Sequence, residues 1–175
     1  MVTVAISGLH GAGKTAAATA LAEKLDLRHV SGGSVFRQMA EERDMTLAEF
    51  SSYVEEHPEI DREIDERTKK EAGKDDVLLD ARLAGWMAED ADLKILLTAP
   101  LEVRIERIIK REDRSYEEVK EETIAREESE KKRYKDIYDI DVDDRSCFDL
   151  ILNTGKFNEE EMIQLLEQAV RFVSD

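Results

Sequence analysis

The chain has 175 residues, a length that suits one domain built from a sheet and flanking helices. Its 42 acidic residues against 26 basic ones give a formal net charge of −16, which argues against a nucleic-acid binder because a duplex would be repelled. Hydrophobic residues make up 41% of the chain, enough for a packed core. Such an acidic surface is typical of a very soluble protein, and adaptation to high internal salt is an alternative that the composition leaves open.

The only cysteine, Cys147, excludes an intramolecular disulfide and fits a reducing compartment. No activating partner is evident near it in the sequence, so we expect a buried or half-buried thiol rather than a nucleophile. The first residues do not resemble a signal peptide, and no apolar run approaches the ~18 residues of a membrane-spanning helix. We therefore expect a cytoplasmic protein that binds no membrane.

Apolar runs that alternate with helix-forming segments predict an α/β domain with a parallel sheet. Gly32 and Gly33 are expected to form a turn after a short strand, with Ser34 capping the next helix, which runs to about residue 43. A helix rich in Ala and Leu is expected at residues 14–24. The five expected strands are residues 2–7, 29–31, 77–80, 93–97 and 148–153.

Two charged helices are expected between the second and third strands. Thr46 and Glu49 match a capping box, which begins a short helix. A second, strongly charged helix is expected at residues 59–72, where Gly73 ends it. Because residues 44–72 show little apolar periodicity, we expect these helices to project beyond the core.

The second half of the chain carries three further helix-start signals. Pro100 lies where a helix would begin after the fourth strand. Ser115 and Glu118 form another capping box, which begins a long charged stretch to about residue 138 that is also expected to project. Asn158 caps a final amphipathic helix.

Residues 8–15 match the phosphate-binding pattern G-x-x-x-x-G-K-[ST] at every fixed position, between an apolar strand and a helix. Glycines let successive N–H groups point at phosphate oxygens, and the dipole of the following helix favours the same negative charge. Lys14 can reach the outer phosphates, and the Thr15 hydroxyl can bind Mg²⁺. The expected ATP-binding residues are Gly8, Leu9, His10, Gly11, Ala12, Gly13, Lys14 and Thr15.

The rest of the chain favours a small-molecule kinase over a switch GTPase. Residues 153–156 do not match the guanine-reading N-K-x-D, and residues 80–83 do not match D-x-x-G. Several arginines are present instead, and guanidinium groups are suited to holding two anions close together. Arg37 follows the expected Gly-Gly turn, and Arg82 follows the third strand, at the sheet edge where ligands bind in open parallel sheets.

Other charged residues have less specific interpretations. Arg104 and Arg114 are expected to pair with nearby acids as solvated helix charges. Asp80, at the end of the third strand, is placed either to bind Mg²⁺ through water or to cap the next turn. The three histidines, His10, His29 and His57, lack the spacing of a zinc site.

Three stretches beyond the phosphate-binding loop resemble the archaeal type of cytidylate kinase, in the nucleoside monophosphate kinase superfamily. They are residues 29–37, 82–87 and 126–134 with 138–141 following, and the similarity extends from about residue 2 to 157. The resemblance implies a three-layer P-loop kinase fold with a five-stranded parallel sheet. It also implies transfer of a phosphoryl group from Mg-ATP to CMP or dCMP.

The resemblance further divides the single domain into parts. A core of residues 1–31, 76–111 and 126–175 would carry a helical monophosphate-binding insert at about 32–75 and a mobile lid at about 112–125. Because these parts must swing, we expect a monomer.

Residue roles follow from the same resemblance. Ser34, Arg37 and Arg82 would hold the acceptor, and Glu130 and Arg133 would meet the cytosine or its phosphate.

On the ATP side, Lys14 would act as described above. Arg107 and Arg111 would steady the ATP phosphates, and Arg126 would bridge the group in transfer.

The chain departs from the family's pattern at Ala81, where a glycine is usual and a Cβ would crowd the substrate phosphate, and near the last strand at Gly155 and Phe157. Another kinase, for adenylate or shikimate, and a nucleotide-binding regulatory ATPase remain the alternatives. The ranking of CMP, dCMP and UMP is not determined by these residues.

Overall fold

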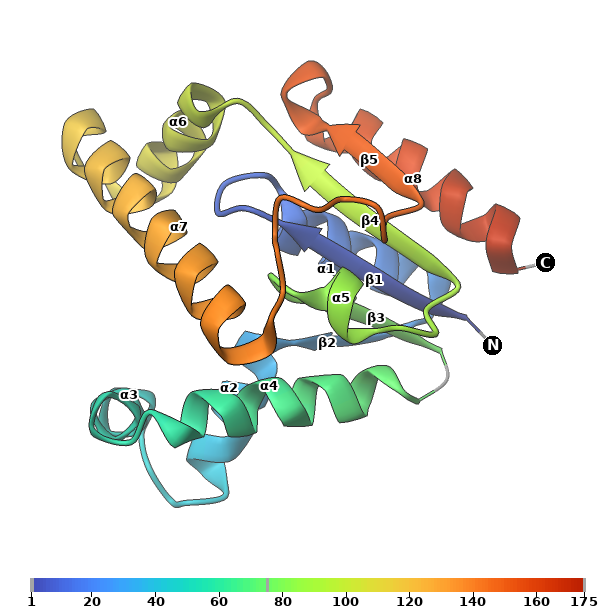
Figure 1. Ribbon diagram of the computed structural model, residues 1–175. Coiled ribbons are helices and arrows are strands. Elements are labelled where there is room, and N and C mark those ends of the chain that lie inside the picture. Colours follow the sequence, from blue (N-terminus) through green and yellow to red (C-terminus); the bar gives the residue numbers. More distant parts are fainter. Residues whose placement is uncertain (1, 75, 175) are drawn as a thin grey trace.

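The computed structural model describes residues 2–74 and 76–174, and its centre is a five-stranded sheet with helices on both faces (Figure 1). The strands lie in the order β2-β3-β1-β4-β5, and every neighbouring pair is parallel. This confirms the predicted fold class. The strands are β1 (Thr3–Gly8), β2 (Arg28–Ser31), β3 (Val77–Asp80), β4 (Leu93–Thr98) and β5 (Leu150–Asn153).

The two faces of the sheet contribute to two separate cores. Successive residues of a strand point to opposite faces, so Val4 and Ile6 of β1 pack with helices α1 (Lys14–Leu25) and α8 (Glu159–Ser174). Ala5, between them, belongs to the second core on the other face. That face is covered by the short helix α5 (Ala84–Met87), which was not predicted, and by the insert helices.

The insert consists of α2 (Gly32–Glu41), α3 (Leu47–Glu56) and α4 (Glu59–Ala72). The expectation that its charged helices project beyond the core is wrong. Phe50 is fully buried, with its ring centroid 4.7 Å from that of Phe36, and Ile60 is buried in the same cluster as Val30 of the sheet. The apolar residues of α3 and α4 are few, but neighbouring elements complete the core around them.

The start of α2 also differs from the prediction. Ser31 is the N-cap: its hydroxyl accepts from the Ser34 amide at 3.0 Å, while the Ser34 hydroxyl accepts from the Ser31 amide at 2.9 Å. Gly32 and Gly33 therefore lie in the first helical turn rather than in a separate turn. This reciprocal bonding stabilises a helix start one residue after β2.

Helices α6 (Leu101–Glu112) and α7 (Tyr116–Tyr138) share a small core and lie beside the carboxyl ends of the strands (Figure 1). The predicted capping boxes at Ser115 and Thr46 are confirmed, and Asn158 accepts from the Glu161 amide at 2.9 Å, as expected for a cap. The far end of α7 reaches the insert helices. Helix α7 does not simply project into solvent, because Glu130 and Tyr134 are buried.

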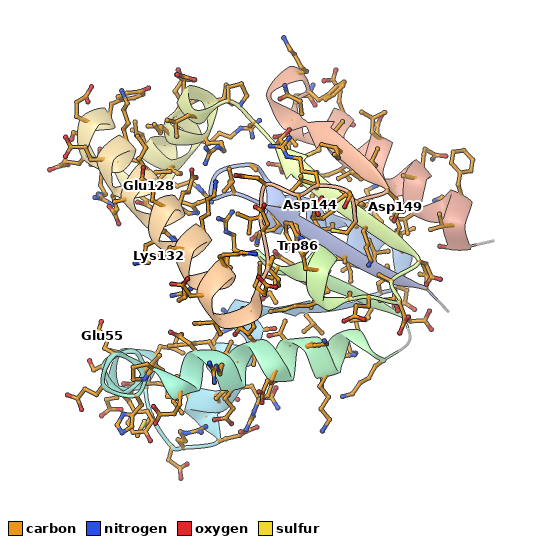
Figure 2. The ribbon with its side chains drawn as sticks, viewed as in Figure 1. Glu55, Trp86, Glu128, Lys132, Asp144 and Asp149 are labelled. Atoms are coloured by element: carbon orange, nitrogen blue, oxygen red, sulfur yellow. The ribbon has the colours of Figure 1, made fainter. Side chains whose placement is uncertain are left out.

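The acidic surface follows from the same arrangement. Charged side chains such as Glu55, Glu128 and Lys132 are exposed and point away from their helices (Figure 2). No helix in the described ranges is long and apolar enough to cross a membrane. Cys147 is a half-buried free thiol, as predicted, and burial raises its pKa.

The last strand begins at Leu150, two residues later than predicted, because Phe148 packs under α5 instead of joining the sheet. Its ring lies edge-on to Trp86, with centroids 4.9 Å apart. A Cβ on Gly85 would lie 2.2 Å from that ring, and the Gly85 amide donates to Ser7 Oγ of β1 at 2.9 Å. Close contact between α5 and Phe148 therefore requires glycine at position 85.

We predict that Gly85→Ala lowers the free energy of unfolding by about 1–3 kcal/mol, because the added methyl group overpacks this contact. Urea denaturation followed by circular dichroism measures the change. Gly32→Ala is the matched control, since a Cβ there meets no atom within 4 Å, and its free energy of unfolding should stay equal or rise slightly. Equal losses in the two variants would contradict the proposed constraint at Phe148.

Candidate active site

The phosphate-binding loop between β1 and α1 has a conformation that depends on glycine. Gly11 and Gly13 have φ angles of 82° and 94°, in the left-handed region. A Cβ on Gly11 would also lie 2.7 Å from the carbonyl oxygen of Arg104, and one on Gly8 would lie 2.9 Å from that of Leu97. The loop thus packs directly against α6 and β4, with no room for side chains at these positions.

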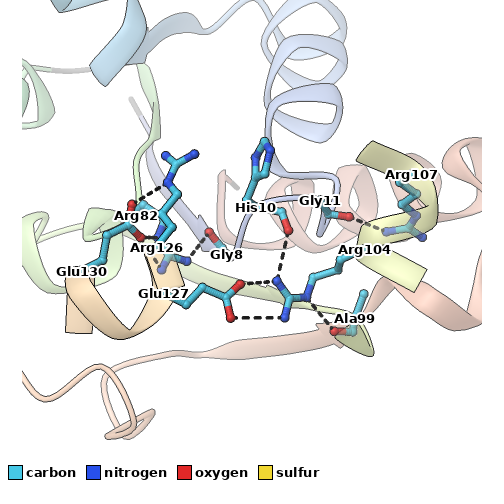
Figure 3. Close-up of polar contacts among 10 residues, drawn as sticks. All are labelled: Gly8, His10, Gly11, Arg82, Ala99, Arg104, Arg107, Arg126, Glu127 and Glu130. Carbon is cyan, nitrogen blue, oxygen red and sulfur yellow. Dashed lines mark hydrogen bonds and ion pairs between the residues drawn. The ribbon is translucent and has the colours of Figure 1, made fainter. Parts of the chain in front are cut away.

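Two arginines of α6 hold the loop through its carbonyl oxygens (Figure 3). Arg104 donates to His10 O at 3.2 Å and to Ala99 O at 3.1 Å, and its guanidinium pairs with Glu127 of α7. Arg107 donates to Gly11 O at 3.1 Å. With carbonyl groups engaged in this way, the loop keeps the open form in which backbone amides can bind an anion.

A buried threonine completes this support. Thr154 follows β5, donates its hydroxyl proton to Ala12 O at 2.7 Å and accepts from Arg107 at 2.9 Å. Arg107 also donates to the carbonyl oxygen of Thr154 at 2.8 Å. Thr154 was not singled out in the sequence, where its only signal is its place just after a strand at the carboxyl edge of the sheet.

The prediction that Arg104 and Arg114 pair with acids is confirmed for both, but the prediction that Arg104 is solvated is wrong. Arg104 is 4% exposed and bonds to the loop, so it is not a solvated helix charge. Arg114 is exposed and pairs with Glu112 and Glu122, as expected. Both arginines have acidic neighbours in the sequence, so the sequence alone does not distinguish them. Packing of α6 against the loop buries Arg104 and leaves Arg114 exposed.

Lys14 lies at the N-terminus of α1, with its Nζ 2.5 Å from Asp80 Oδ1. Asp80 is 2% exposed, and its second oxygen lies 3.4 Å from His29 Nε2. Burial alone would raise the pKa of Asp80, but the contacts with His29 and Lys14 outweigh it and hold this pKa below its ordinary value. Asp80 contacts these side chains rather than the next turn, so the capping alternative is wrong.

Arg82 and Arg126 are joined by one buried carboxylate (Figure 3). Glu130 Oε2 accepts from Arg82 Nε at 2.9 Å, and Oε1 accepts from Arg126 Nε at 3.0 Å. Arg82 also donates to Gly8 O at 3.1 Å, which connects this group to the phosphate-binding loop. Both oxygens of Glu130, the residue expected to meet the cytosine or its phosphate, therefore hold arginines in place.

Two cavities meet at Lys14 and Thr15, which line both of them. The first has a volume of about 520 Å³ and contains Arg107 and Arg111. The second has a volume of about 560 Å³ and lies between the loop, the insert and α7. Its lining includes the predicted residues Arg37, Asp80, Ala81, Arg82 and Arg126, and also His29, Asp65 and Tyr134.

Two predicted site residues, Ser34 and Arg133, do not line the second cavity. Ser34 is engaged in the cap of α2, where its hydroxyl also donates to Ser31 O at 2.8 Å. Arg133 lies over the ring of Tyr134, 5.4 Å from its centroid. Arg37 lines the second cavity and Arg111 the first, and neither has a hydrogen-bond or ion-pair partner among the described residues, which leaves both cations available to a ligand.

One contact between the insert and α7 was missed by sequence reasoning. The Tyr138 hydroxyl donates to Asp65 Oδ2 at 2.5 Å. Burial raises the pKa of Asp65, against the effects of Tyr138 and Arg133, and burial also raises the pKa of Tyr138. No local pattern could have predicted a contact between residues 73 positions apart.

A phosphate-binding loop on a parallel sheet, with its lysine between two cavities and arginines around both, defines a P-loop phosphotransferase. Solved structures share the fold. A shikimate kinase from Bacteroides thetaiotaomicron has a TM-score of 0.63 at 16% identity, covering 97% of this chain and 98% of that one. A shikimate kinase from Acinetobacter baumannii in complex with shikimate has a TM-score of 0.62 at 15% identity, covering 98% and 94%.

The chain matches the cytidylate kinase-like family over residues 3–156 and belongs to that family. It is 48% identical over 169 residues to a cytidylate kinase from Halobacterium salinarum, covering 95% of this chain and 88% of the relative. It is 47% identical over 171 residues to one from Methanocaldococcus jannaschii, covering 95% and 96%. These similarities confirm the resemblance predicted from the sequence.

We predict that Arg104→Met lowers the free energy of unfolding by about 2–4 kcal/mol, because it strips Glu127 of its partner and frees two backbone carbonyls. The KM for ATP should rise as well, since the loop loses its hold at His10. Denaturant unfolding and steady-state kinetics measure the two effects.

Arg114→Met, in the connection between α6 and α7, is the matched control, and its exposed pairs should contribute less than about 1 kcal/mol. If Arg104→Met behaved like Arg114→Met in both measurements, the anchoring role of Arg104 would be rejected.

Proposed function

We propose that the chain transfers the γ-phosphoryl group of Mg-ATP to CMP and dCMP, giving CDP and dCDP. The observation that carries this proposal is the meeting of two arginine-containing cavities at Lys14 and Thr15. Membership of the cytidylate kinase-like family and the named cytidylate kinases among its relatives support cytidine nucleotides as acceptors.

ATP would occupy the first cavity, with its phosphates on the loop and its outer charge near Arg107 and Arg111. The monophosphate would occupy the second, where Arg37 and Arg82 hold its phosphate. Arg126, in the lining of the second cavity and tied to Glu130, would reach the group in transfer. Ala81 lines the same cavity, so its Cβ sets a limit on how closely the acceptor phosphate approaches β3.

The donor set fits the magnesium ion that accompanies ATP. Thr15 offers a hydroxyl and Asp80 a carboxylate, both in the lining of one cavity, and oxygen ligands of this kind are those that Mg²⁺ takes. When bound, the ion neutralises phosphate charge. Thr15 would hold it directly and Asp80 through water, while the ATP phosphates replace Asp80 as the partner of Lys14.

The chain's own residues position the reactants and neutralise charge. The acceptor phosphate is already an anion, so its oxygen can attack the γ-phosphorus in line without a side-chain base. We further propose that the insert at about 32–75 and the lid at about 112–125 close over the two substrates and exclude water. An enzyme with such moving parts would work as a monomer, and its one half-buried thiol fits the cytoplasm.

The first test measures ADP release from Mg-ATP at low and molar KCl, with each monophosphate offered singly. We expect CMP and dCMP to stimulate release well above UMP and AMP, and Lys14→Ala to abolish it because the phosphates lose their charged partner. Adenylate or shikimate as the better acceptor would identify one of the other kinases. Release without any acceptor dependence would indicate a regulatory ATPase and reject the proposal.

A second prediction separates the two cavities. Arg82→Ala should raise the KM for CMP by about 10- to 100-fold, the effect of one charge-assisted hydrogen bond, and change the KM for ATP far less. Arg171→Ala, which removes an exposed arginine of α8 paired with Glu167, is the control and should change neither constant. Equal effects of Arg82→Ala on both substrates would place the acceptor elsewhere.

A further inference from the structure

Lys14 and Asp80 form an ion pair that the proposed reaction must separate. Asp80 is 2% exposed, and its Oδ1 lies 2.5 Å from Lys14 Nζ. In the proposed reaction the ATP phosphates replace Asp80 as the partner of Lys14. A buried carboxylate that loses its cation is destabilised, because water reaches it poorly and no other charge compensates it. The release of Lys14 therefore depends on what else contacts the carboxylate of Asp80.

The second oxygen of this carboxylate faces His29 of β2, which pairs with β3. Val30 and Leu79, the strand neighbours of His29 and Asp80, are buried on the side of the sheet that the insert covers. Because successive residues of a strand point to opposite faces, His29 and Asp80 share the other face, where α1 begins with Lys14. The imidazole and the carboxylate are thus brought together by the pairing of two strands.

The ring nitrogen Nε2 of His29 has no completed hydrogen bond. It lies 3.4 Å from Asp80 Oδ2, beyond the usual length of an N–H···O bond. Among the described residues it is the one buried side-chain nitrogen or oxygen without a hydrogen-bond partner. Buried polar atoms nearly always have a partner, so an atom left without one calls for an explanation. A small approach of the carboxylate would complete the bond.

Competition between Lys14 and His29 for one carboxylate explains why this bond is incomplete. The two side chains contact different oxygens of Asp80, at 2.5 Å and 3.4 Å, and the charged lysine holds the carboxylate more closely. Once Lys14 moves to the ATP phosphates, that pull is removed and the carboxylate can approach Nε2. In the tautomer with its proton on Nε2, the neutral imidazole then donates to Oδ2.

We propose that His29 is a positioning residue that stabilises the carboxylate of Asp80 when Lys14 leaves it for the phosphates of ATP. His29 touches neither substrate in this role and acts through Asp80. It lowers the free energy needed to separate the ion pair, and so it raises the affinity for ATP. The inference rests on the proposed kinase function and adds a residue to the set that prepares the phosphate-binding site.

The first test is calorimetric titration of His29→Met with ATP in EDTA, where no magnesium contributes, and with CMP. We expect the Kd for ATP to rise by about tenfold or more, the effect of one hydrogen bond to a charged group. The Kd for CMP should stay unchanged, although His29 lines the second cavity. His57→Met is the matched control: this histidine bonds to Tyr53 O outside that lining, and neither Kd should change.

Two further variants distinguish positioning from a general structural role. His29→Gln should restore most of the affinity for ATP, because its amide N–H group can reach the place of Nε2, whereas a loss of packing would not be repaired in this way. In an Asp80→Asn background, His29→Met should have little further effect on the Kd for ATP, since the carboxylate through which His29 acts is gone. Circular dichroism confirms that each variant is folded.

The failures can be told apart. An unchanged Kd for ATP in His29→Met, a loss of CMP binding instead, or full additivity with Asp80→Asn would overturn the inference and leave the kinase function intact. A wild-type protein that binds ATP and responds to no monophosphate would overturn the proposed function, while the ATP titrations would still accept or reject the role of His29.

Discussion

The site depends on the way the phosphate-binding loop is held from behind. Arg104, Arg107 and Thr154 take up carbonyl oxygens of the loop, and Gly8 and Gly11 allow it to approach β4 and α6. Binding a polyphosphate requires backbone amides that already point at it, since reorganising the loop would weaken affinity. Arg104 and Arg107 belong to α6, which follows β4, and Thr154 follows β5. The site therefore forms only when β4 and β5 are in place.

The second constraint is the assembly of cations in a strongly acidic chain. Each cluster of positive charge at the site is built around one carboxylate: Asp80 holds Lys14, Glu127 holds Arg104, and Glu130 joins Arg82 to Arg126. A buried carboxylate of this kind offsets repulsion between neighbouring cations before the substrates supply their own negative charge. Arg37 and Arg111, which have no such partner among the described residues, are then the cations most free to meet the ligands.

The parts of this molecule that were predictable from sequence are those set by local chemistry. The phosphate-binding loop, the alternation of strands and helices, and the caps at Thr46, Ser115 and Asn158 each depend on residues close together in the chain. The burial of Arg104, the packing of Phe50 under the sheet and the contact of Asp65 with Tyr138 depend on elements far apart in sequence. Even the cap of α2 fell on Ser31 rather than Ser34 because two serines share the same bonds. Long-range packing determines which of several locally equivalent residues is buried or bonded, and no pattern in the sequence shows which one it is.

The contact between Asp65 and Tyr138 also connects the insert with α7, two of the parts that enclose the second cavity. Asp65 belongs to the insert and Tyr138 to the end of α7, the helix that carries Glu130 and its two arginine partners into the cavity. An acceptor that contacts both Arg37 of the insert and Arg126 of α7 in this cavity would bridge the two parts directly. The energy of binding the correct acceptor would then favour the enclosed arrangement needed for transfer, which is how substrate binding energy contributes to specificity in the reaction itself.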